Sequence, residues 1–286
     1  QLPTCCWRSN KRSRSSAICW RANPAAARRC LQKGTYVKIK ASQFDNDISK
    51  PRSAGASFAQ TSSEYESATF ECVEYGVENM LDDLDVAEAE TDALLDIVTV
   101  TSNQLADNIM VGHEIRVANA LSGASFNSTA ATAVMSNAGA ATPIADINAA
   151  VQRLNGNGIF NNIQLIMEAS LYQEMTQTDD MRNLINGSGA LAFSQDQVAR
   201  VLGVDGVVLC NSRYNSAKKG QAGSRTKIWP TTSFYVASIA NGPLSNGGIG
   251  RTLFYNARGN GAFTSETYRS EQPPANVVRV RSNLDE

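Results

Sequence analysis

The sequence predicts a mixed α+β fold organised around one long helix. Five carboxylates at the start of a segment at residues 86–120 would complement the positive end of a helix dipole, and Gly123 supplies a stop. A helix of about 35 residues would span on the order of 50 Å, which is typical of an elongated subunit rather than of a compact enzyme. Apolar residues at spacings of mostly three and four predict one buried face, and they are Leu94, Leu95, Val98, Leu105, Ile109, Val117 and Leu121.

Charges are separated along the chain, although the formal net charge of the 286 residues is only -1. Residues 1–52 carry twelve basic and two acidic groups, and residues 53–115 carry fourteen acidic groups and no basic one. Residues 116–286 carry fourteen basic and eleven acidic groups, so the three balances are +10, -14 and +3. Because blocks of opposite sign attract each other within a chain or between copies of it, this layout indicates a subunit that binds its neighbours.

The first part of the chain is predicted to form an extended arm and then a long hairpin. Residues 1–33 are basic and Ser-rich and show no sustained period. Apolar residues interrupt polar ones at 35–40 and at 68–75, which predicts two strands. The polar residues 42–63 between them predict a loop. Such a hairpin has little apolar material of its own, so we expect a partner surface to order it.

The rest of the chain interleaves helices and strands. Residues 122–142 carry almost no charge and predict a loop, after which Pro143 opens a helix to Leu154 with Thr142 as N-cap. Ser194 is the expected cap of a further helix. The mixture of both kinds of element without an internal repeat supports the α+β class. The other predicted elements are a helix at 168–175, strands at 163–167, 207–210, 227–229, 233–237, 252–255 and 277–281, and a basic loop at 212–226.

Candidate catalytic and metal-binding groups are few. His113 is the only histidine, so a Ser-His-Asp or Cys-His site would require it, and a metal site built on several histidines is excluded. Its place inside the long helix favours a packed or surface histidine. The spacing of the six cysteines matches no paired CxxC zinc site. The glycines at 187–189 and 247–250 lack the neighbours of a phosphate-binding loop, so the sequence predicts no catalytic residue, cofactor or metal.

The order of these elements resembles that of the major capsid proteins of tailed bacteriophages, which have the Hong Kong 97-like fold. The shared order is a basic N-terminal arm, a long hairpin, a long helix with an acidic start, and then an α/β region. Local stretches also resemble that family, and the resemblance covers roughly residues 34–281. The stretches are Glu71–Glu78, Pro143–Leu154, Gln197–Asn215, Lys227–Trp229 and Tyr268–Arg281.

This resemblance implies a division into four parts and a structural role. It implies a self-assembling head-shell protein of the virion that is not an enzyme, carries no cofactor, contacts no membrane and assembles in the host cytoplasm. Its implied partners are identical subunits in hexamers and pentamers of an icosahedral shell, packaged double-stranded DNA bound non-specifically on the inner face, and cement, portal and scaffold proteins. The implied parts are an N-terminal arm at 1–33, an extended hairpin loop at 34–75, a peripheral domain with the spine helix at 76–159 and 251–286, and an axial domain at 160–250.

Charged residues of the arm, the hairpin and the helix start are the candidate subunit contacts. The arm cations could also contact nucleic-acid phosphates, and the two roles are not exclusive. Two other functions stay open: an encapsulin-type compartment shell of the same fold, and a soluble α/β enzyme that uses carboxylates for acid–base chemistry. The acidic candidates are Asp82, Asp83, Asp85, Glu88 and Glu90, and the basic candidates are Arg12, Arg14, Arg28, Arg29 and Lys50.

Overall fold

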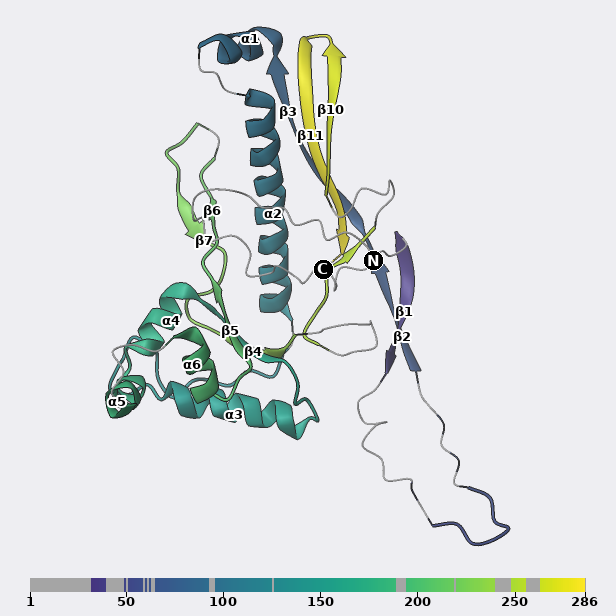
Figure 1. Ribbon diagram of the computed structural model, residues 1–286, viewed down its shortest axis with the longest axis vertical. Helices are drawn as coiled ribbons and strands as arrows, with labels where there is room; N and C mark the ends of the chain where they lie inside the picture. The colour runs from purple at the N-terminus through teal and green to yellow at the C-terminus, as the bar shows by residue number, and fades with distance from the viewer. Residues whose placement is uncertain are drawn as a thin grey trace.

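The structure is a computed structural model, and it is elongated (Figure 1). A long helix, α2 (Ile97–Gly123), runs beside a narrow antiparallel sheet. A body of shorter helices lies at one end of α2, and a hairpin extends away from the sheet (Figure 1). The structure describes residues 32–39, 49, 51–58, 60, 62, 65–92, 96–124, 126–188, 194–218, 220–239, 248–255 and 263–285.

The long sheet has the strand order β10-β11-β3 and is antiparallel. Its strands are β3 (Val73–Asp82), β10 (Phe263–Glu271) and β11 (Pro274–Asp285), and the short β9 (Leu253–Phe254) pairs with the end of β11. Alternate residues of a strand point to opposite faces. Val278 and Val280 therefore pack against α2, and Arg279 and Arg281 lie on the face turned away from it. We call this second surface the outer sheet face.

The prediction of a single helix at 86–120 is wrong, because two helices occupy this segment. Helix α1 (Asp83–Asp92) precedes α2, which is 27 residues long. The carboxylate of Asp96 caps α2 by accepting a hydrogen bond from the backbone N–H of Thr99 at 3.0 Å. An aspartate that bonds to the backbone three residues ahead starts a new helix there. The acidic residues assigned to the start of the long helix therefore lie in α1 and at the end of β3.

Helix α2 also buries two faces and not the single face that the apolar spacing predicted. Leu105 and Ile109 in its first half pack against the long sheet. Val117 and Leu121 in its second half pack into a different cluster, with Trp229. At about 100° per residue, the two sets, with Ala118, are separated by roughly 150° around the helix axis. Helix α2 is therefore a connector between the sheet on one side and the helical body on the other.

The helical body contains a three-stranded sheet of order β5-β4-β8, in which β4 is parallel to β5 and antiparallel to β8. Leu165 and Met167 of β4 are buried in its core together with Ile147, Val198 and Leu202 from the helices. The expected caps lie at the helix starts. Thr142 is the N-cap residue of the helix that begins at Pro143, although its side chain makes no capping hydrogen bond. Ser194 forms a capping box at the start of the helix that begins at Gln195. The elements are α3 (Pro143–Gly156), β4 (Ile163–Glu168), α4 (Ala169–Thr176), α5 (Asp179–Ser188), α6 (Gln195–Val201), β5 (Gly206–Cys210) and β8 (Tyr235–Ser238).

Helix α3 belongs to this core by its contacts. Ile147 and Val151 of α3 are buried against the residues around β4. A domain boundary at residue 160 would leave α3 with the long sheet, whereas its apolar face packs in the helical body. The uncharged loop before Pro143 is the segment that connects α2 to this body.

Two antiparallel hairpins complete the described fold. The first pairs β1 (Lys33–Ile39) with β2 (Tyr65–Glu71), and the second pairs β6 (Arg213–Asn215) with β7 (Arg225–Lys227). The strand predicted at 68–75 is in fact divided between β2 and β3, which meet at the buried Cys72. Strand β10 was missed because its sequence is mostly polar, and α5 was missed as well. The predicted arm at 1–33 lies outside the described residues except for residues 32 and 33.

Candidate subunit interfaces

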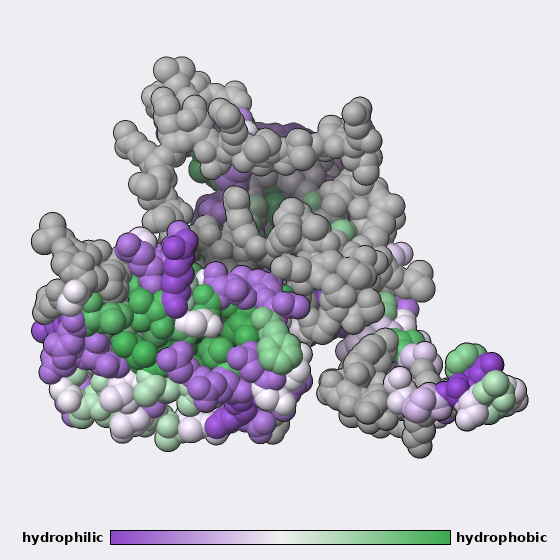
Figure 2. All heavy atoms as spheres, turned by 60° about the horizontal axis from the view of Figure 1, so that its bottom comes forward, coloured by the Kyte–Doolittle hydropathy of each residue, from purple (hydrophilic) through white to green (hydrophobic). Residues whose placement is uncertain are grey.

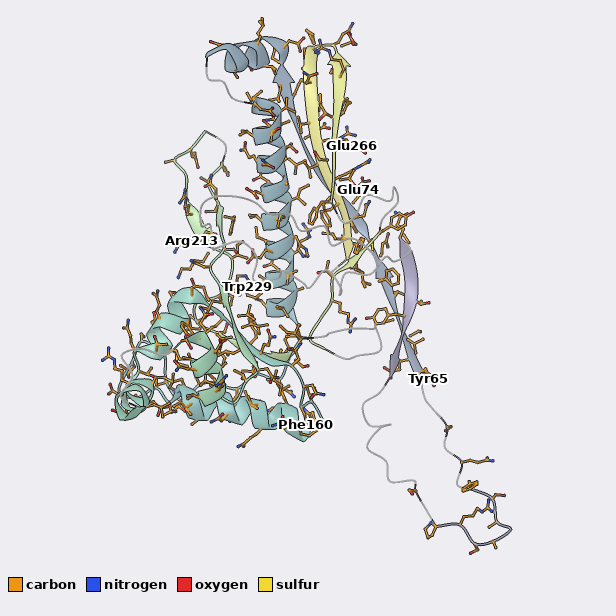
Figure 3. The ribbon with its side chains drawn as sticks, in the orientation of Figure 1. Tyr65, Glu74, Phe160, Arg213, Trp229 and Glu266 are labelled. Atoms are coloured by element: carbon orange, nitrogen blue, oxygen red, sulfur yellow. The ribbon has the colours of Figure 1, made fainter. Side chains whose placement is uncertain are left out.

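The β1–β2 hairpin and its loop expose large apolar side chains. Val37 is 60% exposed and Tyr65 is 64% exposed. Farther along the loop, Phe58 is 71% exposed and lies under the guanidinium of Arg52 at 4.6 Å. The described strands pair with each other, and the hairpin projects from the sheet (Figures 1 and 3). Large exposed apolar side chains on a projecting ribbon indicate a contact with another surface.

The base of this hairpin is fixed to the long sheet. The backbone N–H of Glu71 donates to the carboxylate of Asp285 at 3.1 Å, so β2 is joined to the end of β11. The backbone N–H of Cys72 donates to the carbonyl of Gln32 at 2.8 Å. Lys33 and Glu71 form an ion pair at 2.5 Å across the hairpin. The direction in which the hairpin leaves the subunit is therefore set by its base.

The outer sheet face carries a ladder of ion pairs. Arg281 lies between Glu74 at 3.3 Å and Glu266 at 2.5 Å, and its side chain is only 18% exposed. Arg279 donates to Glu78 at 2.8 Å. These arginines of β11 therefore supply counter-charges, within the same chain, for part of the acidic block at residues 53–115. The signal was present in the sequence as the alternation of arginines at 279 and 281 in a predicted strand.

Helix α1 contains most of the predicted acidic contact residues, and the structure gives them different surroundings. Asp83 is bound in a bidentate ion pair by Arg269, with N···O distances of 2.5 and 2.6 Å. The carboxylate of Asp82 accepts a hydrogen bond from the backbone N–H of Leu84. Asp85 and Glu88 are exposed. The side chain of Glu90 lies outside the described residues, as do Arg12, Arg14, Arg28, Arg29 and Lys50.

The ion pair of Asp83 is strong enough to change its acidity. The hydrogen bond from Arg269 lowers the pKa of Asp83 below its usual value, although partial desolvation opposes the change. Asp83 is therefore ionised and held within its own chain. Among the described residues at this end of the subunit, Asp85, Glu88 and Leu84, which is 79% exposed, are available to a partner.

A buried carboxylate fixes the base of the β6–β7 hairpin. Glu168 is 2% exposed and accepts hydrogen bonds from the backbone N–H and the hydroxyl of Ser170 at the start of α4. Lys227 of β7 forms an ion pair with Glu168 at 3.1 Å and donates to the Ser170 hydroxyl at 2.6 Å. Burial acts to raise the pKa of Glu168, but the hydrogen bonds from Ser170 and Lys227 outweigh it and lower the pKa. The carboxylate thus anchors both a helix and a hairpin.

The same hairpin is joined to α2 through Trp229. Its indole N–H donates to the buried carboxylate of Glu114 at 2.8 Å (Figure 3 labels Trp229). The Trp229 ring packs with Val117, Ala118 and Leu121 of α2. The segment that follows β7 is therefore locked to the helix by both packing and a hydrogen bond.

The described residues bring together no evident catalytic site. Ser170 and Lys227 are in hydrogen-bonding contact, but the Lys227 amine is also engaged in an ion pair with the buried Glu168, and this contact anchors the hairpin. The carboxylate of Asp82 accepts a hydrogen bond from the backbone N–H of Leu84, and that of Asp83 forms an ion pair with Arg269. No group of three or more His, Cys, Asp and Glu side chains in this part of the chain could hold a metal ion. His113 is half-buried on α2.

The helical body exposes apolar side chains as well. Figure 2 shows hydrophobic residues gathered on its surface. Ile159 and Phe160, which follow α3, are 38% and 66% exposed. Among the described helices, none combines the length and the apolar character that crossing a membrane requires.

Comparisons with known proteins identify the fold. Protein-family models and curated proteins give no match to the sequence. A solved structure of a phage-related protein from Bordetella bronchiseptica RB50 matches with a TM-score of 0.66 at 16% identity, over 96% of this chain and 88% of that chain. A protein of Microbacterium phage Oxtober96 matches with a TM-score of 0.54 at 12% identity, over 99% and 89%. The capsid of an empty GTA particle matches with a TM-score of 0.53 at 12% identity, over 100% and 89%.

The chain has the fold of a phage capsid subunit. The Hong Kong 97-like α+β fold expected from the order of elements is therefore confirmed. With identities of 12–16%, the similarity concerns the fold and does not transfer roles to individual residues.

Proposed function

We propose that this chain is the major capsid protein of a tailed bacteriophage, which self-assembles as hexamers and pentamers into the icosahedral head shell around double-stranded DNA. The protein would reside in the virion and assemble in the host cytoplasm. Its function is then structural rather than enzymatic, and its chief partner is a further copy of itself. Contacts with DNA on the inner face and with cement, portal or scaffold proteins belong to the same proposal.

The observation that carries this proposal is the projecting β1–β2 hairpin on a chain with a capsid-subunit fold. The hairpin exposes Val37, Phe58 and Tyr65 but is fixed at its base to β11. A ribbon of this kind gains stability when a second surface covers its apolar side chains. In a closed shell, every subunit supplies such a surface to a neighbour.

We further propose a division of labour within the chain. The long sheet, α1 and α2 form the peripheral domain, and β1–β2 is the extended loop. Because α3 shares the core around β4, we place the start of the axial domain in the loop before Pro143 rather than at residue 160. The arm cations and Lys50 remain candidate contacts, as do Asp85 and Glu88, whereas Asp83 supports its own subunit.

Electron microscopy of the purified protein tests the proposal. We expect negatively stained preparations to contain closed particles of uniform diameter, built from rings of five and six subunits. Particles purified from infected cells should also contain DNA that is protected from nuclease. A protein that stays monomeric under all salt and pH conditions would contradict the assembly function, and closed particles that enclose only protein cargo would contradict the DNA-packaging role.

A further inference from the structure

A second hairpin, β6–β7, carries exposed basic side chains that form no ion pair with the described residues of its own chain. Residues 206–265 contain seven Lys and Arg residues and no Asp or Glu. Arg213, Lys218 and Arg225 of the hairpin are exposed. None of these three forms an ion pair with another described residue, in contrast to Lys227 at the hairpin base. Three uncompensated cations on one projecting element indicate an acidic binding partner.

Hydrogen bonds within this hairpin hold its described residues together. The side-chain oxygen of Asn215 accepts hydrogen bonds from the backbone N–H groups of Ala217 and Ser224, at 3.1 and 2.9 Å. The backbone N–H of Ser216 donates to the carbonyl of Ser224 at 2.8 Å. Gly220 has a φ of +87°, which glycine adopts without strain. Since the loop is ordered by its own hydrogen bonds and anchored through Lys227 and Trp229, little conformational entropy is lost on binding.

The outer sheet face is the complementary surface. It carries five carboxylates against the two guanidinium groups of Arg279 and Arg281, and they are Glu74, Glu78, Asp82, Glu266 and Asp285. The net charge of this face is therefore -3. Glu74 and Glu78 keep more than half of their side-chain surface exposed, 55% and 52%, while they bind the arginines. A carboxylate has two oxygens and about four acceptor positions, so each can accept further cations.

The two surfaces lie on opposite flanks of the subunit. Helix α2 packs against the inner face of the long sheet through Leu105 and Ile109, and against the base of the hairpin through Val117 and Leu121. Figure 3 shows Arg213 and Glu74 on opposite sides of α2, each beside the helix rather than beyond its ends. In the same chain, α2 therefore stands between the hairpin and the sheet.

We propose that the β6–β7 hairpin of one copy binds the outer sheet face of the next copy in the ring. A closed ring of identical subunits requires a heterologous interface, in which two different flanks of the subunit meet. The β6–β7 hairpin and the outer sheet face are two such flanks. They carry charges of opposite sign, and they lie on opposite sides of α2. This inference depends on the proposed assembly function, because it assumes ring-forming copies.

Zero-length crosslinking tests the contact directly. A carbodiimide joins a lysine amine to a carboxylate only when the two are in direct contact. Shells are assembled from equal amounts of subunits labelled with ¹⁴N and ¹⁵N and are treated with the carbodiimide. The crosslinked peptides are then identified by mass spectrometry. We expect mixed-isotope peptides that join Lys218 or Lys219 to Glu74, Glu78 or Glu266.

The matched control keeps the charge but removes the reactive amine. In the variant Lys218→Arg with Lys219→Arg, shells should form at the parental yield and the crosslinked peptide should be absent. In the variant Arg213→Glu with Arg225→Glu, the yield of shells in low salt should fall on the order of tenfold, because like charges would face each other. The exposed Arg200→Glu on α6 should leave the yield unchanged.

The outcomes separate this inference from the proposed function. Three results would overturn the inference and leave the assembly function intact. Shells could form in which the hairpin is crosslinked only to α1 carboxylates, in which its crosslinked peptides carry a single isotope, or in which it is not crosslinked at all. The same holds if changes at Arg213 and Arg225 reduce nuclease-protected DNA but not shell yield, which would assign the hairpin to nucleic acid. Failure of the parent protein to form any shell would overturn both.

Discussion

Replacing Glu168 by glutamine should loosen the link between β4, α4 and the β6–β7 hairpin. The buried carboxylate accepts from the backbone N–H of Ser170 at 2.7 Å, from the Ser170 hydroxyl and from Lys227 at 3.1 Å. A glutamine has a single acceptor oxygen, and its NH2 group would face hydrogen-bond donors. The variant therefore loses an ion pair and part of a helix cap while the size of the side chain is kept.

The magnitude follows from these contacts. Removing one partner of a fully buried pair costs about 3–5 kcal/mol. The side chain of Lys227 is 30% exposed and can be partly rehydrated, so we expect a smaller loss of about 2–3 kcal/mol, of which the weakened cap of α4 is about 1 kcal/mol. A loss of this size corresponds to amide exchange about 30- to 150-fold faster in α4 and β7.

Hydrogen exchange of unassembled subunits, resolved by peptide, measures this effect at pH 7. Glu174→Gln is the matched control, because Glu174 lies on the same helix and is exposed. The variant at Glu168 should exchange faster in α4 and β7 and at the parental rate in the long sheet. Equal exchange in the two variants would refute the argument that this carboxylate holds the hairpin.

The pH dependence of the effect has a defined sign. The pKa of Glu168 is lower in the folded protein than its ordinary value of 4.5. The stabilisation is therefore complete above about pH 4.5 and is lost as the pH falls through the lower, folded-state pKa. The difference between the parent and Glu168→Gln should be constant from pH 6 to 8 and should shrink in the acid range.

Three further predictions concern assembly. The strands β1 and β2 should be strongly protected from hydrogen exchange in shells and weakly protected in free subunits, because a neighbour covers their apolar side chains. Replacing Asp85 with Asn and Glu88 with Gln should weaken assembly most at low salt, where exposed charges are least screened. Replacing His113 by glutamine should leave particle yield unchanged within a few-fold, because the described residues contain no group of three or more metal-ligand side chains to which the imidazole could belong.

Each of these predictions has its own control and opposing result. Equal, strong protection of β1 and β2 in both states would show that the hairpin is stable alone. Asp107→Asn, a similar change on α2, is the control for the α1 variant, and full assembly of that variant at every salt concentration would remove Asp85 and Glu88 from the interface. If the parent protein catalysed a measurable reaction and the folded His113→Gln variant did not, the alternative that this chain is an enzyme would be supported.

Helices and strands could be predicted where their signals lie in residues close together in the sequence. The helix at Pro143, the capping box at Ser194 and the strand at 163–167 depend on residues a few positions apart, so their signals survive in any tertiary context. The order of a long hairpin, a long helix and an α/β region was sufficient to predict the fold. Strand β10 left no such signal, since its polar residues become a strand only through pairing with β11.

The contacts between charges were decided by the tertiary structure. The sequence alone established that fourteen carboxylates lie between residues 53 and 115 without a basic residue. It could not say which cations meet them, because Arg279 and Glu78 are 201 positions apart and become neighbours only when β11 pairs with β3. Arg213, Lys218 and Arg225 of the β6–β7 hairpin, in contrast, form no ion pair with another described residue. A charge pattern thus determines that oppositely charged surfaces attract, whereas strand register determines which of them are satisfied within the subunit.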